Sequence, residues 1–187
     1  MGLQRSFPAH DDIQGILGTA LVGVTSFTYK QYRATGVPMP HVTQGDVFSM
    51  IFQFPHRKKL GTILDSVHLH WIPIASKDGD IAFTYTWGWY NHGDVVPNTL
   101  PNTGTVADIT LATTDQYKQK INILISNLAL PASGDDVYSS ILYVTLTAAA
   151  PADGTNWWTT GNEIAIAYMD AHYVTDRNGS LLETTDS

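Results

Sequence analysis

A hydrophobic period of two runs through most of this chain and limits its fold more than any other feature. Seven segments place apolar residues at alternate positions: 47–54, 63–74, 81–90, 105–113, 121–130, 140–148 and 164–174. Successive side chains of a strand point to opposite faces of a sheet, so each segment has one face suited to a core. No helical period is sustained, which argues against α/β architectures.

Composition supports the same fold class. Charged residues make up 14% of the chain, and only Glu163 and Glu183 are glutamates, so strong helix formers are scarce. Turn clusters such as 76–80, 91–94, 133–136 and 152–155 separate the strand candidates. The sequence therefore predicts an all-β protein: a β-sandwich of about seven to nine antiparallel strands, with a jelly roll as the favoured topology.

Charge and residue content exclude several classes of function. The formal net charge is −7, and the densest basic run is Arg57-Lys58-Lys59, so we expect no nucleic-acid partner. There is no cysteine, which removes disulfide scaffolds and thiolate metal sites. No apolar run is long enough to span a membrane, and no secretory signal is recognisable.

The pattern divides the chain into three parts. Residues 1–46 are predicted to form a docking segment with one or two strands, packed on the same domain or on a neighbour. Within them we expect an irregular stretch at 7–14, strands in 16–32 and a break at 36–40. Residues 47–177 form the predicted sandwich, and 178–187 a polar tail.

A histidine pair is the sharpest local feature. His68 and His70 are two residues apart on a predicted strand, so both imidazoles share one face. Cupin enzymes use such an HxH pair with a following glutamate, which is missing here, so further ligands would have to come from His172 or Asp170. Trimeric phage fibres offer another arrangement, with one HxH from each chain around an axial ion. We favour a structural role and expect no metal or cofactor.

Four tryptophans are the other candidates. Trp87 and Trp89 share a strand face, where they either stack on a glycan or fill the space between two sheets. Trp157 and Trp158 are adjacent in a loop-like stretch, so an extended chain would expose one of them. Exposed tryptophan is a good contact anchor, and we predict that this pair forms a partner interface.

Four sequence features together resemble a family of tailed-bacteriophage virion proteins. They are a phenylalanine-rich strand ending in Pro-His (residues 52–56), an HxHW strand (68–71), an aromatic strand with an Asn-x-Gly turn (85–93) and a D-x-H-Y-x-x-D-x-x-G-S motif (170–180). The last motif is the most specific. The chain departs from the family pattern at 148–151, where Ala-Ala-Ala-Pro replaces an expected Arg-Asp.

The resemblance implies a non-enzymatic virion component that is assembled in the host cytoplasm. It favours a capsid decoration or cement protein, or the base of a head fibre, and leaves a tail or neck position open. The implied partners are the major capsid protein or other virion proteins and further copies of this chain, with a trimer favoured. The alternatives from other classes are a carbohydrate-binding β-sandwich module and a cupin-like metalloenzyme.

Overall fold

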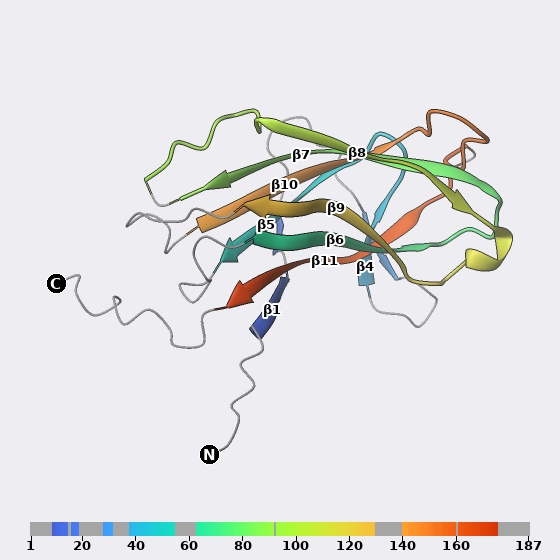
Figure 1. Cartoon of the computed structure of the whole chain (residues 1–187). Coiled ribbons are helices and arrows are strands. Elements are labelled where there is room, and N and C mark those ends of the chain that lie inside the picture. The colour runs from blue at the N-terminus through green and yellow to red at the C-terminus, as the bar shows by residue number, and fades with distance from the viewer. Residues whose placement is uncertain are drawn as a thin grey trace, which may run out of the picture.

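The computed structural model describes residues 9–14, 16–18, 28–31, 38–54, 63–91, 93–129, 140–159 and 161–175 (Figure 1). The loop at 57–59, the turn at 133–136 and the tail at 178–187 lie outside these residues. The strands are β1 (Ala9–Gln14), β2 (Ile16–Gly18), β3 (Thr28–Gln31), β4 (Pro38–Val42), β5 (Val47–Phe54), β6 (Ile63–Pro73), β7 (Gly79–Tyr90), β8 (Asn102–Leu111), β9 (Lys120–Ala129), β10 (Ser140–Ala149) and β11 (Ile164–Thr175). A 3-10 turn, η1 (Thr113–Asp115), precedes β9. None of the described segments is a helix that could cross a membrane.

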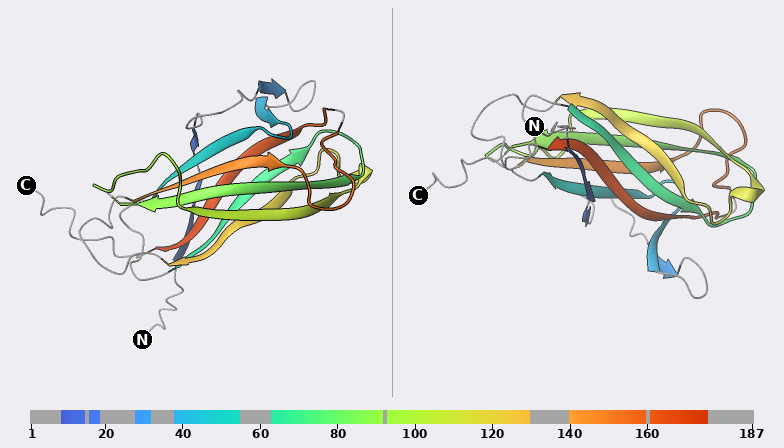
Figure 2. Two further views of the ribbon diagram at one scale, coloured as in Figure 1. Left: turned by 90° about the horizontal axis from the view of Figure 1, so that it is seen from above. Right: turned by 60° about the horizontal axis from the view of Figure 1, so that its bottom comes forward.

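The strands form two antiparallel sheets packed face to face (Figures 1 and 2). Sheet I has the order β3-β4-β11-β6-β9, with β1 also paired to β11, and sheet II has the order β2-β5-β10-β7-β8. The four-strand runs β4-β11-β6-β9 and β5-β10-β7-β8 have the strand order of a jelly roll. This confirms the predicted β-sandwich, and its eight central strands fall within the predicted number.

The core lies between the sheets and is built from the alternate inward positions of the strands. Trp71 of β6 and Phe83 of β7 are fully buried, and their rings meet edge to face at 5.8 Å across the two sheets. The Tyr85 hydroxyl of β7 also crosses the sandwich, where it donates to the Leu124 carbonyl of β9. Gly104 lies on β8, opposite Tyr85 of β7, and a Cβ at this position would overlap the Tyr85 ring. Strand β8 therefore needs a glycine at position 104.

The described residues before position 47 form four strands, where the sequence predicted one or two. All of them belong to the two sheets of this chain: β1 pairs with β11, β2 with β5, and β3 with β4. The irregular stretch expected at 7–14 is wrong for residues 9–14, which pair with β11 along their whole length. This pairing is with a strand more than 150 residues away, so no local pattern shows it.

The break predicted at 36–40 is also wrong in part, because Pro38 begins strand β4. Only His41 and Val42 of β4 pair with β11, and the two prolines pair with β3 alone. Proline cannot donate to a sheet ladder, and here both prolines lie at the end of the strand that β11 does not reach.

Candidate functional site

The histidine pair lies on the outer face of sheet I. Val67, Leu69 and Trp71 of β6 are fully buried in the core. Alternation therefore directs His68 and His70 away from the core, to the side of the sheet that faces outward. The period of two that forms the core thus also places two imidazoles next to each other on the opposite face.

Strand β11 brings a carboxylate and a third imidazole to the same place. Asp170 lies opposite His68 in the ladder between β6 and β11. Its Oδ1 atom is 3.2 Å from His70 Nε2 and 3.5 Å from His68 Nδ1, and its Oδ2 atom is 3.4 Å from His172 Nε2. One carboxylate is therefore in ion-pair range of three imidazoles. We call these four residues the histidine cluster.

Two further residues fix His70. The Gln119 amide nitrogen lies 2.7 Å from His70 Nδ1, and the Tyr168 ring stacks on the imidazole with centroids 4.1 Å apart. An amide NH2 group only donates, so Nδ1 accepts and the neutral ring carries its proton on Nε2, which donates to Asp170. Sequence reasoning missed Gln119 because it lies in the turn before β9 and no motif marks it.

Edge strand β9 gives the histidine cluster an apolar border. Ile121 pairs with His70 and Ile123 with His68 in the ladder between β6 and β9. These two isoleucines are 56% and 58% exposed, which is high for large apolar side chains. The outer face of sheet I thus combines ionisable groups with exposed apolar surface.

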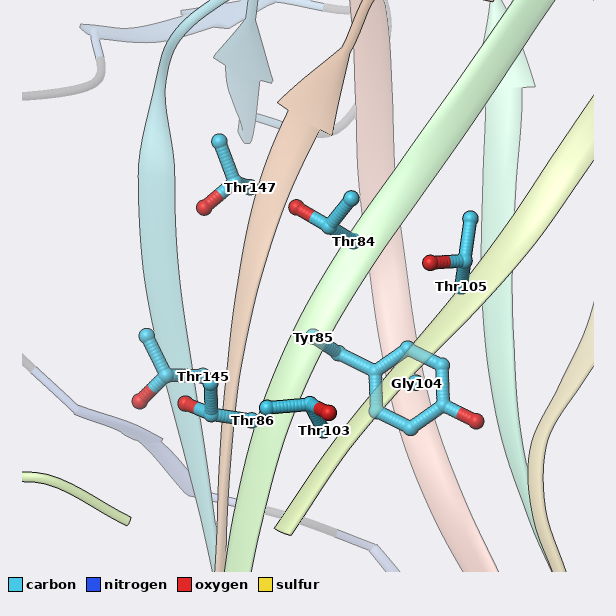
Figure 3. A pocket seen from close by; sticks show the side chains of 8 residues that line it. All are labelled: Thr84, Tyr85, Thr86, Thr103, Gly104, Thr105, Thr145 and Thr147. Carbon is cyan, nitrogen blue, oxygen red and sulfur yellow. The ribbon is translucent and has the colours of Figure 1, made fainter. Parts of the chain in front are cut away.

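The outer face of sheet II carries a different set of side chains. Three adjacent strands each have a Thr-x-Thr sequence, and the strand register aligns these threonines in two rows. The rows are Thr105–Thr84–Thr147 and Thr103–Thr86–Thr145 (Figure 3). Together they line a hollow of about 260 Å³. The repeated Thr-x-Thr pattern was visible in the sequence, but the alignment of the rows depends on register.

A tyrosine pair continues this surface along the same strands. Tyr90 and Tyr143 meet edge to face at 5.9 Å, and a Cβ at Gly88 would overlap the Tyr90 ring. Because Gly88 has no side chain, the Tyr90 ring can lie over it, on the same face as the threonine rows. Burial, with a smaller contribution from Tyr143, raises the pKa of Tyr90. Among the described residues, its buried hydroxyl has no hydrogen-bond partner.

The predicted glycan-stacking residues are not on this face. Trp87 and Trp89 of β7 alternate with the outward Thr86 and Gly88, and both pack against the core from the inner side. Trp89 contacts Phe54 with ring centroids 4.8 Å apart. The structure thus gives these tryptophans the second of the two roles considered from the sequence, which is to fill space between the sheets.

The expectation that Trp157 or Trp158 is exposed is wrong. Trp157 is fully buried and Trp158 is 4% exposed, and their rings meet edge to face. The loop turns rather than running extended, so both side chains point inward and both indole N–H groups donate to backbone carbonyls, of Lys77 and Ala149. The pair therefore offers little surface to a partner.

No known protein family and no curated protein sequence matches this chain. Among solved structures, TmCBM61 in complex with β-1,4-galactotriose has 10% identity and a TM-score of 0.29, covering 88% of this chain and 86% of that one. CtCBM11 has 10% identity and a TM-score of 0.32, covering 92% and 93%. These TM-scores are too low to relate this chain to either protein.

Proposed function

We propose that this chain is a non-catalytic β-sandwich module that binds a neutral carbohydrate on the outer face of sheet II. The observation that carries the proposal is the hollow lined by two aligned rows of threonines, with Tyr90 and Tyr143 further along the same strands. It is a shallow, open surface suited to a flat ligand that offers many hydroxyl groups.

The chemistry of the lining fits a sugar. A threonine hydroxyl both donates and accepts, so the six side chains of the rows match the mixed donors and acceptors of a sugar ring. None of the eight lining residues, all of them described, is charged, which disfavours phosphates and acidic sugars. A tyrosine ring beside such hydroxyls supplies the apolar surface on which a sugar face can stack.

Isothermal titration against neutral oligosaccharides, selected from a glycan array, tests this proposal. The double variant Thr86→Val and Thr103→Val keeps side-chain shape and removes two hydroxyls, so we expect affinity to fall about tenfold or more. The matched control is Thr110→Val on β8, because that hydroxyl bonds to Asp80 outside the hollow. Absence of any glycan binding, or equal affinity in the double variant, would refute the proposal.

A second candidate function concerns where the chain works. The motif resemblance to tailed-phage virion proteins, together with the exposed Ile121 and Ile123 on edge strand β9, supports a structural role in the virion. In this role the chain is a capsid decoration or cement protein or a head-fibre base, or else a tail or neck component. Apolar side chains on an edge strand provide contact area for a capsid protein or for further copies in a trimer.

Light scattering on the purified chain and mass spectrometry of purified phage particles test the virion role. We expect a trimer or another closed oligomer in solution and the chain among the particle proteins. The variant Ile121→Thr with Ile123→Thr should weaken particle association, whereas Val95→Thr, at a residue 88% exposed in the segment between β7 and β8, should not. Absence of the chain from particles would remove this candidate and leave the carbohydrate proposal untouched.

A further inference from the structure

We propose that His68, His70 and Asp170 bind one divalent transition-metal ion per chain on the outer face of sheet I. Each offers one ligand atom, and the three atoms lie within 4.8 Å of one another. The inference is independent of the proposed carbohydrate site, because that site lies on the other sheet of the sandwich.

The separations of the donor atoms match those around a tetrahedral ion. Bonds of 2.0–2.1 Å from such an ion place neighbouring donors about 3.3–3.4 Å apart. Asp170 Oδ1 lies 3.2 Å from His70 Nε2 and 3.5 Å from His68 Nδ1. Two of the three donor pairs are thus spaced as ligands are, and the third pair, His68 with His70, lies within 4.8 Å and would have to shorten when the ion binds.

The kind of donor selects the kind of metal. Two imidazole nitrogens and one carboxylate oxygen suit zinc, iron, nickel or copper, whereas magnesium and calcium prefer oxygen ligands. One carboxylate also offsets part of the charge of a divalent ion. Three protein ligands leave a fourth position for water or for another ligand, which is the open arrangement that reactive metal sites share.

Neighbouring residues complete the surroundings of the site. Metal binding through His70 Nε2 requires the other tautomer of the ring, with the proton on Nδ1. A metal-binding histidine usually donates this other N–H group to an oxygen, and turning over the Gln119 amide would place one 2.7 Å from His70 Nδ1. His172 Nε2 lies 3.4 Å from Asp170 Oδ2, the carboxylate oxygen that does not face the two ligand histidines. Gln119 and His172 therefore act as positioning residues.

The site is partly exposed to solvent, and its ligands are held by paired strands. The side chains of His68, His70 and Asp170 are 20%, 7% and 12% exposed, so an ion can enter from the His68 side without unfolding. The three ligands belong to two strands paired directly in the sheet, and His70 is further held by the stacked Tyr168. A site on rigid strands loses little entropy when the ion binds.

The test is Zn²⁺ binding to the untagged, full-length chain after chelator treatment and dialysis. Competition against a chromogenic chelator should give one ion per chain, and the thermal midpoint should rise by about 5–10 °C at a hundredfold excess over Kd. Co²⁺ in place of Zn²⁺ should give the strong visible absorption of a four-coordinate site. The double variant His68→Asn and His70→Gln, which keeps amide groups near the ligand nitrogens, should lower Zn²⁺ affinity at least a hundredfold.

Two further variants separate metal binding from folding, and the number of ions per chain separates this site from a shared axial site. His41→Gln alters another buried histidine, bonded to Glu163 at 3.0 Å, and should leave Zn²⁺ affinity unchanged. If the double variant fails to fold, Asp170→Asn is a second variant that should lose Zn²⁺ affinity. Equal affinity in the parent and in the folded variants, or no bound ion at micromolar Zn²⁺, overturns the proposal. One ion per three chains overturns it in favour of a shared axial site.

Discussion

The two sheets have similar inner faces and very different outer faces. Inside, both contribute buried aromatic and branched residues, such as Trp71 from sheet I and Phe83 from sheet II. Outside, sheet I carries a carboxylate among three imidazoles beside exposed isoleucines, whereas the outer hollow of sheet II is lined by uncharged, mostly hydroxyl-bearing residues.

This difference shows how a jelly roll separates folding from recognition. The inner positions must fill a shared space, so size and apolarity limit what can occupy them. The side chains at the outer positions of the same strands need only point away from the core. The residue types on the outer face of one sheet can therefore differ from those on the other. Substitutions on the inner face should therefore affect stability, and substitutions on the outer faces should affect binding.

The largest expected effect is on the free energy of unfolding, at Trp157, a buried residue that the sequence predicted to contact a partner. Trp157→Ala removes a fully buried indole and its hydrogen bond to the Lys77 carbonyl, so the free energy of unfolding should fall by about 3–5 kcal/mol. Urea denaturation measures this change. Trp157→Phe is the control and should cost clearly less, because most of the ring volume remains. A loss below 1 kcal/mol for the alanine variant would show that the residue is not part of the core.

A contact between the sheets should give the next largest effect. In Gly104→Ala the added Cβ overlaps the Tyr85 ring, which must move away from the Leu124 carbonyl, at an expected cost of about 1–3 kcal/mol. If this overlap is the cause, the cost should shrink when Tyr85→Leu is also present. A double-mutant cycle measured by denaturation checks the coupling, and additive losses would mean that the two residues act separately.

The sequence was sufficient to predict the sheets because their signal is local. Alternation in segments such as 47–54 and 63–74 shows which side chains point inward, and the structure has strands at both places. The same alternation puts His68 and His70 on one face. Strand β1 was missed because its residues 9–14 are held by pairing with β11 and carry no alternating pattern of their own.

The assembled sites depend on information that one segment does not contain. Asp170 meets the histidine pair because β6 and β11 pair across about one hundred residues, and Gln119 joins from a turn before β9. The threonine rows likewise need the register of three strands. The error at Trp157 and Trp158 came from assuming an extended chain, which the turn at that loop does not provide.

The independence of the two outer faces is itself testable. The variant Thr86→Val with Thr103→Val should leave Zn²⁺ affinity within about twofold, and the free energy of unfolding should change by no more than about 0.5 kcal/mol. Conversely, His68→Asn with His70→Gln should leave carbohydrate affinity within the same limits. Reciprocal titration of both ligands on both variants measures this. A change of tenfold in either cross-measurement would contradict the separation of the faces and point to coupling through the core.

The smallest expected effect concerns the turn that leads into β9 and so positions Gln119 near His70. Lys120 Nζ lies 2.8 Å from Asp115 Oδ1, and this contact, with a backbone hydrogen bond from Ala112, lowers the pKa of Asp115. A carboxylate whose pKa is depressed by folding stabilises the folded state above the ordinary pKa of about 3.9, and that stabilisation is lost as pH falls below it. Asp115→Asn should therefore lower stability slightly at pH 7 and have less effect near pH 3, as measured by thermal unfolding at the two pH values. Because the Asp115 carboxylate is near the surface, the difference between the two pH values should be small and should diminish in high salt. An equal loss of stability at both pH values would instead assign the effect to the lost hydrogen bond from the Ala112 backbone.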